Sequence, residues 1–151
     1  MFRGIHSINM DAKGRLAVPA RFRELLAAAC DGKIVVTIDP NSPNLALYPL
    51  DAWEGIQSQI AALPSLNPQA RRLKQLFIGH ASDLEIDGNG RVLVPPLLRK
   101  YAGLEKKLVL LGQDQKIEIW SEDQWESRFD EIRDMTDGLD ELPPEMQTLS
   151  F

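Results

Sequence analysis

One short pattern occurs twice in the sequence and offers its clearest binding chemistry. Asp11-Ala12-Lys13-Gly14-Arg15 and Asp87-Gly88-Asn89-Gly90-Arg91 both place an aspartate three positions before a glycine that an arginine follows. This spacing is typical of a type I turn in which the glycine adopts the left-handed conformation and closes a hairpin. An arginine at such a corner can pair with guanine edges in the DNA major groove, which also admits a two-stranded ribbon. Because a surface ion pair alone adds little stability, we interpret the arginine as a binding residue and the aspartate as a turn residue.

The residues of this candidate site form two sets. The turn-shaping set is Asp11, Gly14, Asp87 and Gly90. The DNA-binding set is Arg15, Lys13, Arg3, Arg91, Asn89 and Arg21. Lys13 and Arg15 are predicted to read guanine edges, whereas Arg3 and Arg21 hold phosphates, which position a protein without specifying sequence. All four are expected around the first turn, whereas Asn89 and Arg91 either make equivalent contacts or stabilise the fold.

Catalysis and metal binding have few candidate residues. The sequence has two histidines, His6 and His80, and one cysteine, Cys30, so a structural zinc site lacks ligands. The stretch His80-Ala81-Ser82-Asp83 has suitable residue types, but adjacency is not the geometry of a catalytic triad. A partial calcium-loop match ends in Val94, where a bidentate glutamate is required. We therefore predict no enzymatic activity, no cofactor and no metal, and the single cysteine fits a reducing cytoplasm.

The charge distribution divides the chain into two parts. Net charge is −5 over 151 residues, but residues 1–113 hold 14 Lys/Arg against 10 Asp/Glu, a net of +4. Residues 114–151 hold 3 against 12, a net of −9. Because the acidity is confined to the last quarter, the remaining surface can still bind a polyanion. No apolar run approaches the roughly 20 residues of a membrane span, so no membrane partner is expected.

The two turns belong to a longer internal repeat. At an offset of 76, residues 10–23 and 86–99 share six identities, and the similarity continues through 51–54 and 123–126 with small length changes. Each copy predicts a strand, a turn, a strand, a short helix and a hairpin. The predicted helices are 20–29 and 96–102, and the predicted hairpins pair 34–38 with 45–48 and 108–111 with 117–120, the second across a turn at 112–115. Capping-box spacing at Asp51 and at Ser121, together with Asn67-Pro68, predicts three further helix starts.

A unit of about 45 residues buries too little surface to be stable alone. We therefore expect the copies to pack on each other in an α+β fold, a pseudo-twofold β-barrel with packing helices. The predicted division is a first unit at 5–52, a helical linker at 53–80, a second unit at 81–124, and a C-terminal helix and acidic tail at 125–151. The tail is expected to be largely disordered from about Thr136. The apolar sides of the linker and C-terminal helices predict an oligomer, for which a closed ring is one solution.

In these motifs, together with Met1-Phe2-Arg3-Gly4, Val18-Pro19 and the Arg71-Arg72 linker, the chain resembles the bacterial MraZ proteins over nearly its whole length. The resemblance implies two tandem SpoVT/AbrB-type swapped-hairpin units and a ring-shaped homo-oligomer. It also implies a transcriptional repressor that binds short G-rich direct repeats of double-stranded DNA at the promoter of the division and cell-wall gene cluster. The implied location is the cytoplasm, in association with the nucleoid.

Two other function classes stay open on sequence grounds. An oligomeric scaffold or antitoxin-like protein could use the same barrel to bind a protein partner. Salt-dependent binding of promoter DNA separates that class from a repressor. A small barrel enzyme is disfavoured because few titratable residues are available as nucleophile or base.

Overall fold

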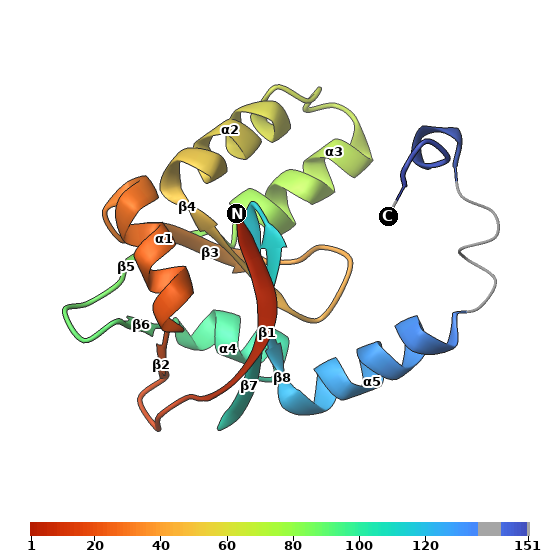
Figure 1. Ribbon diagram of the computed structural model, residues 1–151. Helices are drawn as coiled ribbons and strands as arrows, with labels where there is room; N and C mark the ends of the chain where they lie inside the picture. Colours follow the sequence, from red (N-terminus) through yellow and green to blue (C-terminus); the bar gives the residue numbers. More distant parts are fainter. Residues whose placement is uncertain (136–142, 151) are drawn as a thin grey trace.

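The computed structural model describes residues 1–135 and 143–150, which form an α+β fold (Figure 1). The strands are β1 (Phe2–Asn9), β2 (Arg15–Ala17), β3 (Lys33–Ile38), β4 (Leu45–Pro49), β5 (Ser82–Glu85), β6 (Arg91–Leu93), β7 (Lys107–Asp114) and β8 (Lys116–Ser121). The helices are α1 (Ala20–Cys30), α2 (Leu50–Ala61), α3 (Pro68–Leu73), α4 (Pro96–Ala102) and α5 (Glu122–Asp134). A π-helical turn follows α3 at Lys74–Ile78, and a 3-10 turn lies at Pro144–Met146. The chain thus runs twice through the predicted unit, with the linker helix α3 between the copies.

Strand pairing joins the two copies to each other. One antiparallel sheet has the strand order β1-β7-β8-β4-β3-β5, and a separate two-stranded ribbon pairs β2 with β6. The first copy's β1 pairs with β7 of the second copy, and the second copy's β5 pairs with β3 of the first. Each copy therefore needs the other to complete its sheet, which explains how such small units are stable together.

The register of two pairings shows that the copies are related by a pseudo-twofold axis. In the ribbon, Leu16 lies opposite Val92, its equivalent in the repeat. In the sheet, Ala46 lies opposite Glu118, which are also equivalent positions. Residues that face their own equivalents mark the axis, which therefore passes through the centres of the β2–β6 and β4–β8 pairs.

The six-stranded sheet is open, with β1 and β5 at its edges. An isolated bridge between Met10 and Leu16 links the end of β1 to the ribbon. On the other side, the N–H of Asp87, two residues beyond β5, donates to the carbonyl of Arg91 in the ribbon at 2.9 Å. The ribbon is thus attached at both sheet edges without forming one continuous sheet, and the closed barrel stays a prediction.

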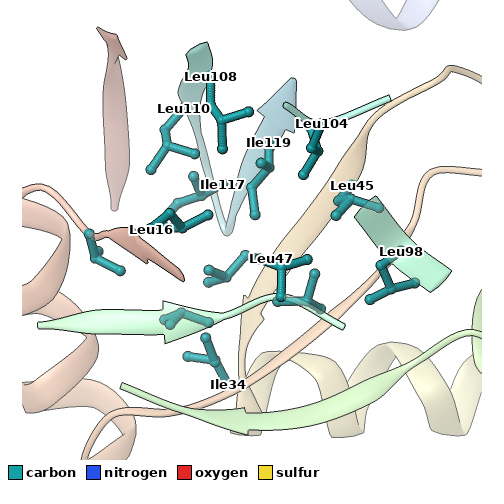
Figure 2. Close-up of a cluster of buried hydrophobic side chains, with 14 of the residues drawn as sticks. Leu16, Ile34, Leu45, Leu47, Leu98, Leu104, Leu108, Leu110, Ile117 and Ile119 are labelled. Atoms are coloured by element: carbon teal, nitrogen blue, oxygen red, sulfur yellow. The ribbon is translucent and has the colours of Figure 1, made fainter. Parts of the chain in front are cut away.

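The main hydrophobic core draws on both copies, whose side chains converge in Figure 2. Leu16 and Val92 enter it from the ribbon, and both are 1% exposed. The sheet contributes the fully buried side chains of Leu45, Leu47, Ile117 and Ile119. Because burying one such aliphatic side chain stabilises a fold by about 1.5–3 kcal/mol, these contacts fix the ribbon against the sheet.

Helices cover the opposite face of the sheet. Tyr48 of β4 packs there with Trp53 of α2 and Phe77 of the π-helical turn. Thr37, fully buried on β3, donates its hydroxyl proton to the carbonyl of Phe77 at 2.6 Å and so ties the linker to the sheet. None of the helices within residues 1–135 and 143–150 is long and apolar enough to cross a membrane.

Helix starts and turns differ from the sequence predictions at two places. Asn67 and Ser121 cap α3 and α5 with their side chains, as predicted. The prediction for Asp51 is wrong, because α2 begins at Leu50 and Asp51 lies in its first turn. The predicted turn at 112–115 is also too long, since β7 and β8 leave only Gln115 between them.

The structure describes only part of the acidic tail. Residues 136–142 and 151, at the start and end of the predicted tail, lie outside the described residues. The described part, 143–150, begins with the 3-10 turn at Pro144–Met146.

Candidate nucleic-acid interface

Each predicted turn closes on a glycine in the left-handed region. The N–H of Gly14 donates to the carbonyl of Asp11 at 3.0 Å, and Gly14 has φ +93°. Gly90, with φ +75°, donates likewise to Asp87 at 2.9 Å. The carbonyl of each glycine then accepts from a valine of the other copy: Val94 N–H donates to Gly14 and Val18 N–H to Gly90, at 3.0 and 2.9 Å. The two turns are therefore fixed to each other's strands.

Each aspartate carboxylate organises its own turn. Oδ1 of Asp11 accepts the backbone N–H groups of Lys13 and Arg15 at 3.0 and 2.9 Å. Oδ1 of Asp87 accepts those of Asn89 and Arg91 at 2.8 and 2.9 Å. These backbone hydrogen bonds, with that from the arginine largest, lower the pKa of both carboxyl groups below the ordinary 3.8, against the opposing effect of desolvation. Both aspartates are therefore ionised at neutral pH.

The β2–β6 ribbon turns two arginines toward solvent on one face. Because side chains alternate along a strand, burial of Leu16 and Val92 directs the flanking residues outward. We call this outward set, Arg15, Ala17, Arg91 and Leu93, the ribbon face. Arg15 lies opposite Leu93 and Arg91 opposite Ala17, so the arginines are diagonal neighbours with Cα atoms about 7–8 Å apart.

The two arginines differ in how firmly their aspartates hold them. Nε of Arg15 donates to Oδ2 of Asp11 at 2.8 Å. Nε of Arg91 lies 3.9 Å from Oδ2 of Asp87 and, within the described residues, has no hydrogen-bond partner. The two arginine side chains remain 33% and 36% exposed, so neither is sealed inside the fold. The positive charge of Arg15 also acts on Asp87 and helps to lower its pKa, so the charges of the two turns form one group.

A second pair of arginines, which the sequence pattern did not assign to the site, lies under the turns. A Cβ atom added to Gly14 would stand 2.6 Å from Cζ of Arg99, and one added to Gly90 would stand 2.1 Å from Nη1 of Arg23. Arg99 is held by a hydrogen bond from its Nε to the carbonyl of Val94 at 3.0 Å. The helix of each copy thus brings a guanidinium group against the other copy's turn. Both arginines are identities in the repeat, and that signal could have identified them.

Arg3 and Arg21 do not join the first turn in the predicted way. They line a surface hollow with Gln113 and Asp114, beside the beginning of β1. Arg3 is eight residues before Asp11, a path of up to about 26 Å along an extended strand. The prediction that Arg3 clusters around the first turn is therefore wrong, because β1 carries it away. Arg21 reaches the same hollow and lies 3.6 Å from Glu24.

A known protein family matches the chain in two segments, one for each copy of the repeat. Residues 1–76 and 77–141 match the family model described as "MraZ protein, putative antitoxin-like". The chain belongs to the MraZ family. It is 52% identical to the "Transcriptional regulator MraZ" of Halorhodospira halophila and 54% identical to that of Saccharophagus degradans, in both cases over the full length of the two chains. It is also 54% identical to the protein of that name from Pseudomonas putida, over 83% of each chain.

Membership of the MraZ family agrees with the expected class of protein. The relatives are named as transcriptional regulators, which is not the name of an enzyme. Among the residues that the structure describes, no three His, Cys, Asp or Glu side chains gather as a metal site. The groups that the fold does gather are the arginines and carboxylates of the ribbon face and its turns.

The first turn gives a test of the glycine geometry. We expect Gly14→Val to lower the free energy of unfolding by about 1–3 kcal/mol, because a β-branched residue resists φ +93° and its Cβ would meet Arg99. Gly88→Val is the matched control, because Gly88 is not among the positive-φ glycines and a Cβ there has no atom within 4 Å. Urea unfolding followed by circular dichroism measures both variants, and equal stability of the two would refute this view of the turn.

The lowered pKa values predict how the turns respond to acid. A carboxyl group whose pKa is lower in the folded state stabilises the fold above its unfolded pKa of about 3.9, and this stabilisation is lost as the pH falls through the folded pKa. We expect the double variant Asp11→Asn with Asp87→Asn to be less stable than wild type at pH 7, and the difference to shrink below about pH 4. Asp83→Asn, at an exposed position on β5, is the control. A difference that stays constant from pH 7 to pH 2 would contradict the assignment.

Proposed function

We propose that this protein is a sequence-specific DNA-binding transcriptional repressor whose ribbon face enters the major groove. The observation that carries the proposal is the placement of Arg15 and Arg91 on one exposed, two-stranded antiparallel ribbon. Such a ribbon fits the width of the major groove, and an arginine can pair bidentately with O6 and N7 of guanine. The relatives are named as transcriptional regulators, which also supports a role in DNA binding.

The geometry of the ribbon suggests how bases are read. Arg15 and Lys13 contact guanine edges, and Arg91 with Asn89 makes the related contacts across the pseudo-twofold axis. A separation of about 7–8 Å between the arginine Cα atoms corresponds to roughly two base-pair steps. The ion pair with Asp11 orients Arg15 before DNA arrives, which reduces the conformational entropy that binding must overcome. Arg3 and Arg21, from their separate hollow, hold phosphates.

One ribbon makes few base contacts, so the affinity of a single subunit is expected to be weak. A ring-shaped homo-oligomer that presents several ribbons to short G-rich direct repeats gains effective concentration, which can raise avidity by about 10²–10⁴. We place these repeats in the promoter of the division and cell-wall gene cluster, and the protein in the cytoplasm with the nucleoid. The spacing of the DNA repeats must then match the spacing of the subunits.

We also propose how the chain divides into structural units. We infer two swapped-hairpin units, at 5–52 and 81–124, which together close a barrel. The linker at 53–80 joins them, and the C-terminal helix and acidic tail at 125–151 follow. The exchange of β1 and β5 between the copies supports this inference, as does the family match that divides after residue 76.

A protein-binding scaffold is the second candidate function, and the antitoxin-like description of the family favours it. It differs from a repressor in its response to salt. Binding through phosphates weakens steeply as salt rises, because counterions released from DNA drive it. A gel-shift series with the chain's own upstream DNA at several salt concentrations therefore separates the two candidates.

Removing the guanidinium group of Arg15 tests the base contact. We expect Arg15→Ala to weaken binding of operator DNA by roughly 1–3 kcal/mol for each guanine contact, compounded across the repeats, with the oligomer unchanged. Lys33→Ala is the control, because it removes one positive charge at an exposed position on β3, outside the ribbon face and α5. Fluorescence anisotropy gives the affinities and light scattering the oligomeric mass. Normal operator binding by Arg15→Ala would show that the assignment of Arg15 is wrong.

Arg3 provides a test of the phosphate role. We expect Arg3→Ala to weaken binding to operator and unrelated duplexes by the same factor, and to reduce the slope of log affinity against log salt by about 1 for each phosphate that the variant no longer neutralises. A titration of both duplexes at four salt concentrations measures this. A selective loss of affinity for the operator, with the salt slope unchanged, would instead place Arg3 on a base.

A further inference from the structure

The two copies of the repeat differ in what covers their outer aromatic side chains. In the first copy, Tyr48 and Trp53 pack with Phe77, which comes from the linker, at ring-centre distances of 5.8, 6.1 and 5.1 Å. Trp53 is only 4% exposed as a result. The π-helical turn after α3 thus covers the aromatic side chains of β4 and α2.

The equivalent cluster of the second copy lacks such a cover. Trp120 and Trp125 stand at the positions of Tyr48 and Trp53, with ring centres 5.6 Å apart, and Phe129 extends the row at 6.2 Å. No residue of α5 is buried, and Phe129 and Ile132 are 45% and 44% exposed. We call Trp125, Phe129 and Ile132 the α5 stripe, since their spacing of four and three residues puts them on one side of the helix.

Charge and shape around the α5 stripe indicate what kind of surface it suits. Helix α5 holds six Asp/Glu and two Lys/Arg, a net of −4, so its partner must be cationic as well as apolar. Beside the stripe, a hollow is lined by Pro43 and Trp120 together with Asp123, Ser127 and Glu131 of α5. Arg133 lies 5.8 Å from the ring centre of Phe129 and shows that this ring accepts a guanidinium group.

The turn between α2 and α3 of the same protein has those complementary properties. Leu66 at its tip is 97% exposed, and Leu63 beside it is 38% exposed. Residues 55–82 contain no acidic side chain. Nζ of Lys74 donates to the carbonyl of Leu63 at 2.7 Å and to Oγ of Ser65 at 3.2 Å, which holds the tip in shape.

The cations of this segment are available for a partner. Arg71 and Arg72 are exposed, and among the described residues neither has a carboxylate within 4 Å. In Figure 1 the α2–α3 turn lies at the top of the molecule and α5 at the lower right. The two surfaces therefore belong to different sides of one chain and can meet only between copies.

We propose that the α5 stripe of one copy receives the α2–α3 turn of a second copy, with Leu63 and Leu66 on the aromatic side chains and Arg71 and Arg72 against the α5 carboxylates. This contact is heterologous, because two different surfaces meet, and such contacts generate closed rings when the rotation between copies closes. The inference deepens the oligomer of the proposed function and rests on it. It adds the two surfaces that meet and the residues that carry the contact.

Complementation between two defective surfaces tests the contact. Phe129→Glu damages the stripe and leaves the turn intact, whereas Leu66→Glu does the reverse. We expect each variant alone to lose the wild-type oligomer and run as a monomer, and an equimolar mixture to form a discrete dimer through its one intact contact. Native mass spectrometry measures the masses, and Ile5→Glu, at an apolar position that is 54% exposed on β1, is expected to keep the wild-type mass. Circular dichroism checks that each variant is folded.

Three outcomes would overturn the proposal. Wild-type mass in both variants would mean that another surface joins the copies, or that the chain's own C-terminal residues cover the stripe. Loss of the oligomer in Phe129→Glu alone would indicate that two α5 helices meet each other. A mixture that stays monomeric would show that the stripe and the turn do not meet. Because these masses are measured without DNA, failure here leaves the DNA-binding proposal to be judged separately by the affinity of the wild-type protein.

Discussion

The pairing of β2 with β6 is the constraint on which the rest of the structure depends. Three residue pairs form this ribbon across the pseudo-twofold axis, and the carbonyl of each turn glycine extends it by accepting from a valine of the other copy. Leu16 and Val92 must enter the core from the ribbon, so alternation along the strands directs Arg15 and Arg91 to solvent. The hydrophobic core thereby determines where the charged face lies.

The charged side chains of the ribbon are held in place by ion pairs but remain exposed to a ligand. Asp11 and Asp87 remain ionised because backbone N–H groups bind their carboxylates, and Asp11 then holds Arg15 through a single nitrogen, Nε. Arg23 and Arg99 add two positive charges beside the turns, so cations outnumber carboxylates there. The acidic residues of the chain are concentrated in its last quarter, beyond residue 113, where α5 lies. Such a division favours a polyanion at the ribbon and a cationic partner at α5.

The sequence predicts the local structure well because turns and caps depend on neighbouring residues. Both Asp-x-x-Gly turns, the caps at Asn67 and Ser121, and the α+β class are found as predicted. Asp51 is not a cap because the helix starts at Leu50, directly after Pro49 and two residues earlier than the capping pattern indicates. The sequence pattern places Gly112 in a turn, but it lies within β7, where a Cβ atom would stand 2.5 Å from the backbone nitrogen of Arg3. The glycine is needed for a close approach of β1, and a pattern of neighbouring residues does not contain that information.

Which copy supplies each strand is likewise a property of the assembled fold. The repeat predicts that two units pack together, whereas the structure shows which strands pair across the copies, β1 with β7 and β5 with β3, and that Arg3 is carried away from the turn. The roles of Arg15, Lys13, Arg91 and Asn89 on DNA stay predictions, as do those of Arg3 and Arg21. The structure contributes the arrangement of the first four around one exposed ribbon, which makes their joint role specific enough to measure.

Protection of the ribbon face by DNA is the most direct measurement. Ala17 is exposed opposite Arg91 and two residues from Arg15, so Ala17→Cys in a Cys30→Ser background places one thiol on this face beside both arginines. Ala28→Cys, exposed on α1, serves as the control. We predict that a saturating promoter duplex slows maleimide modification at position 17 at least tenfold and leaves position 28 unchanged. Unchanged modification at position 17, with DNA shown to be bound in the same sample, would contradict the assignment of the ribbon as the DNA-reading surface.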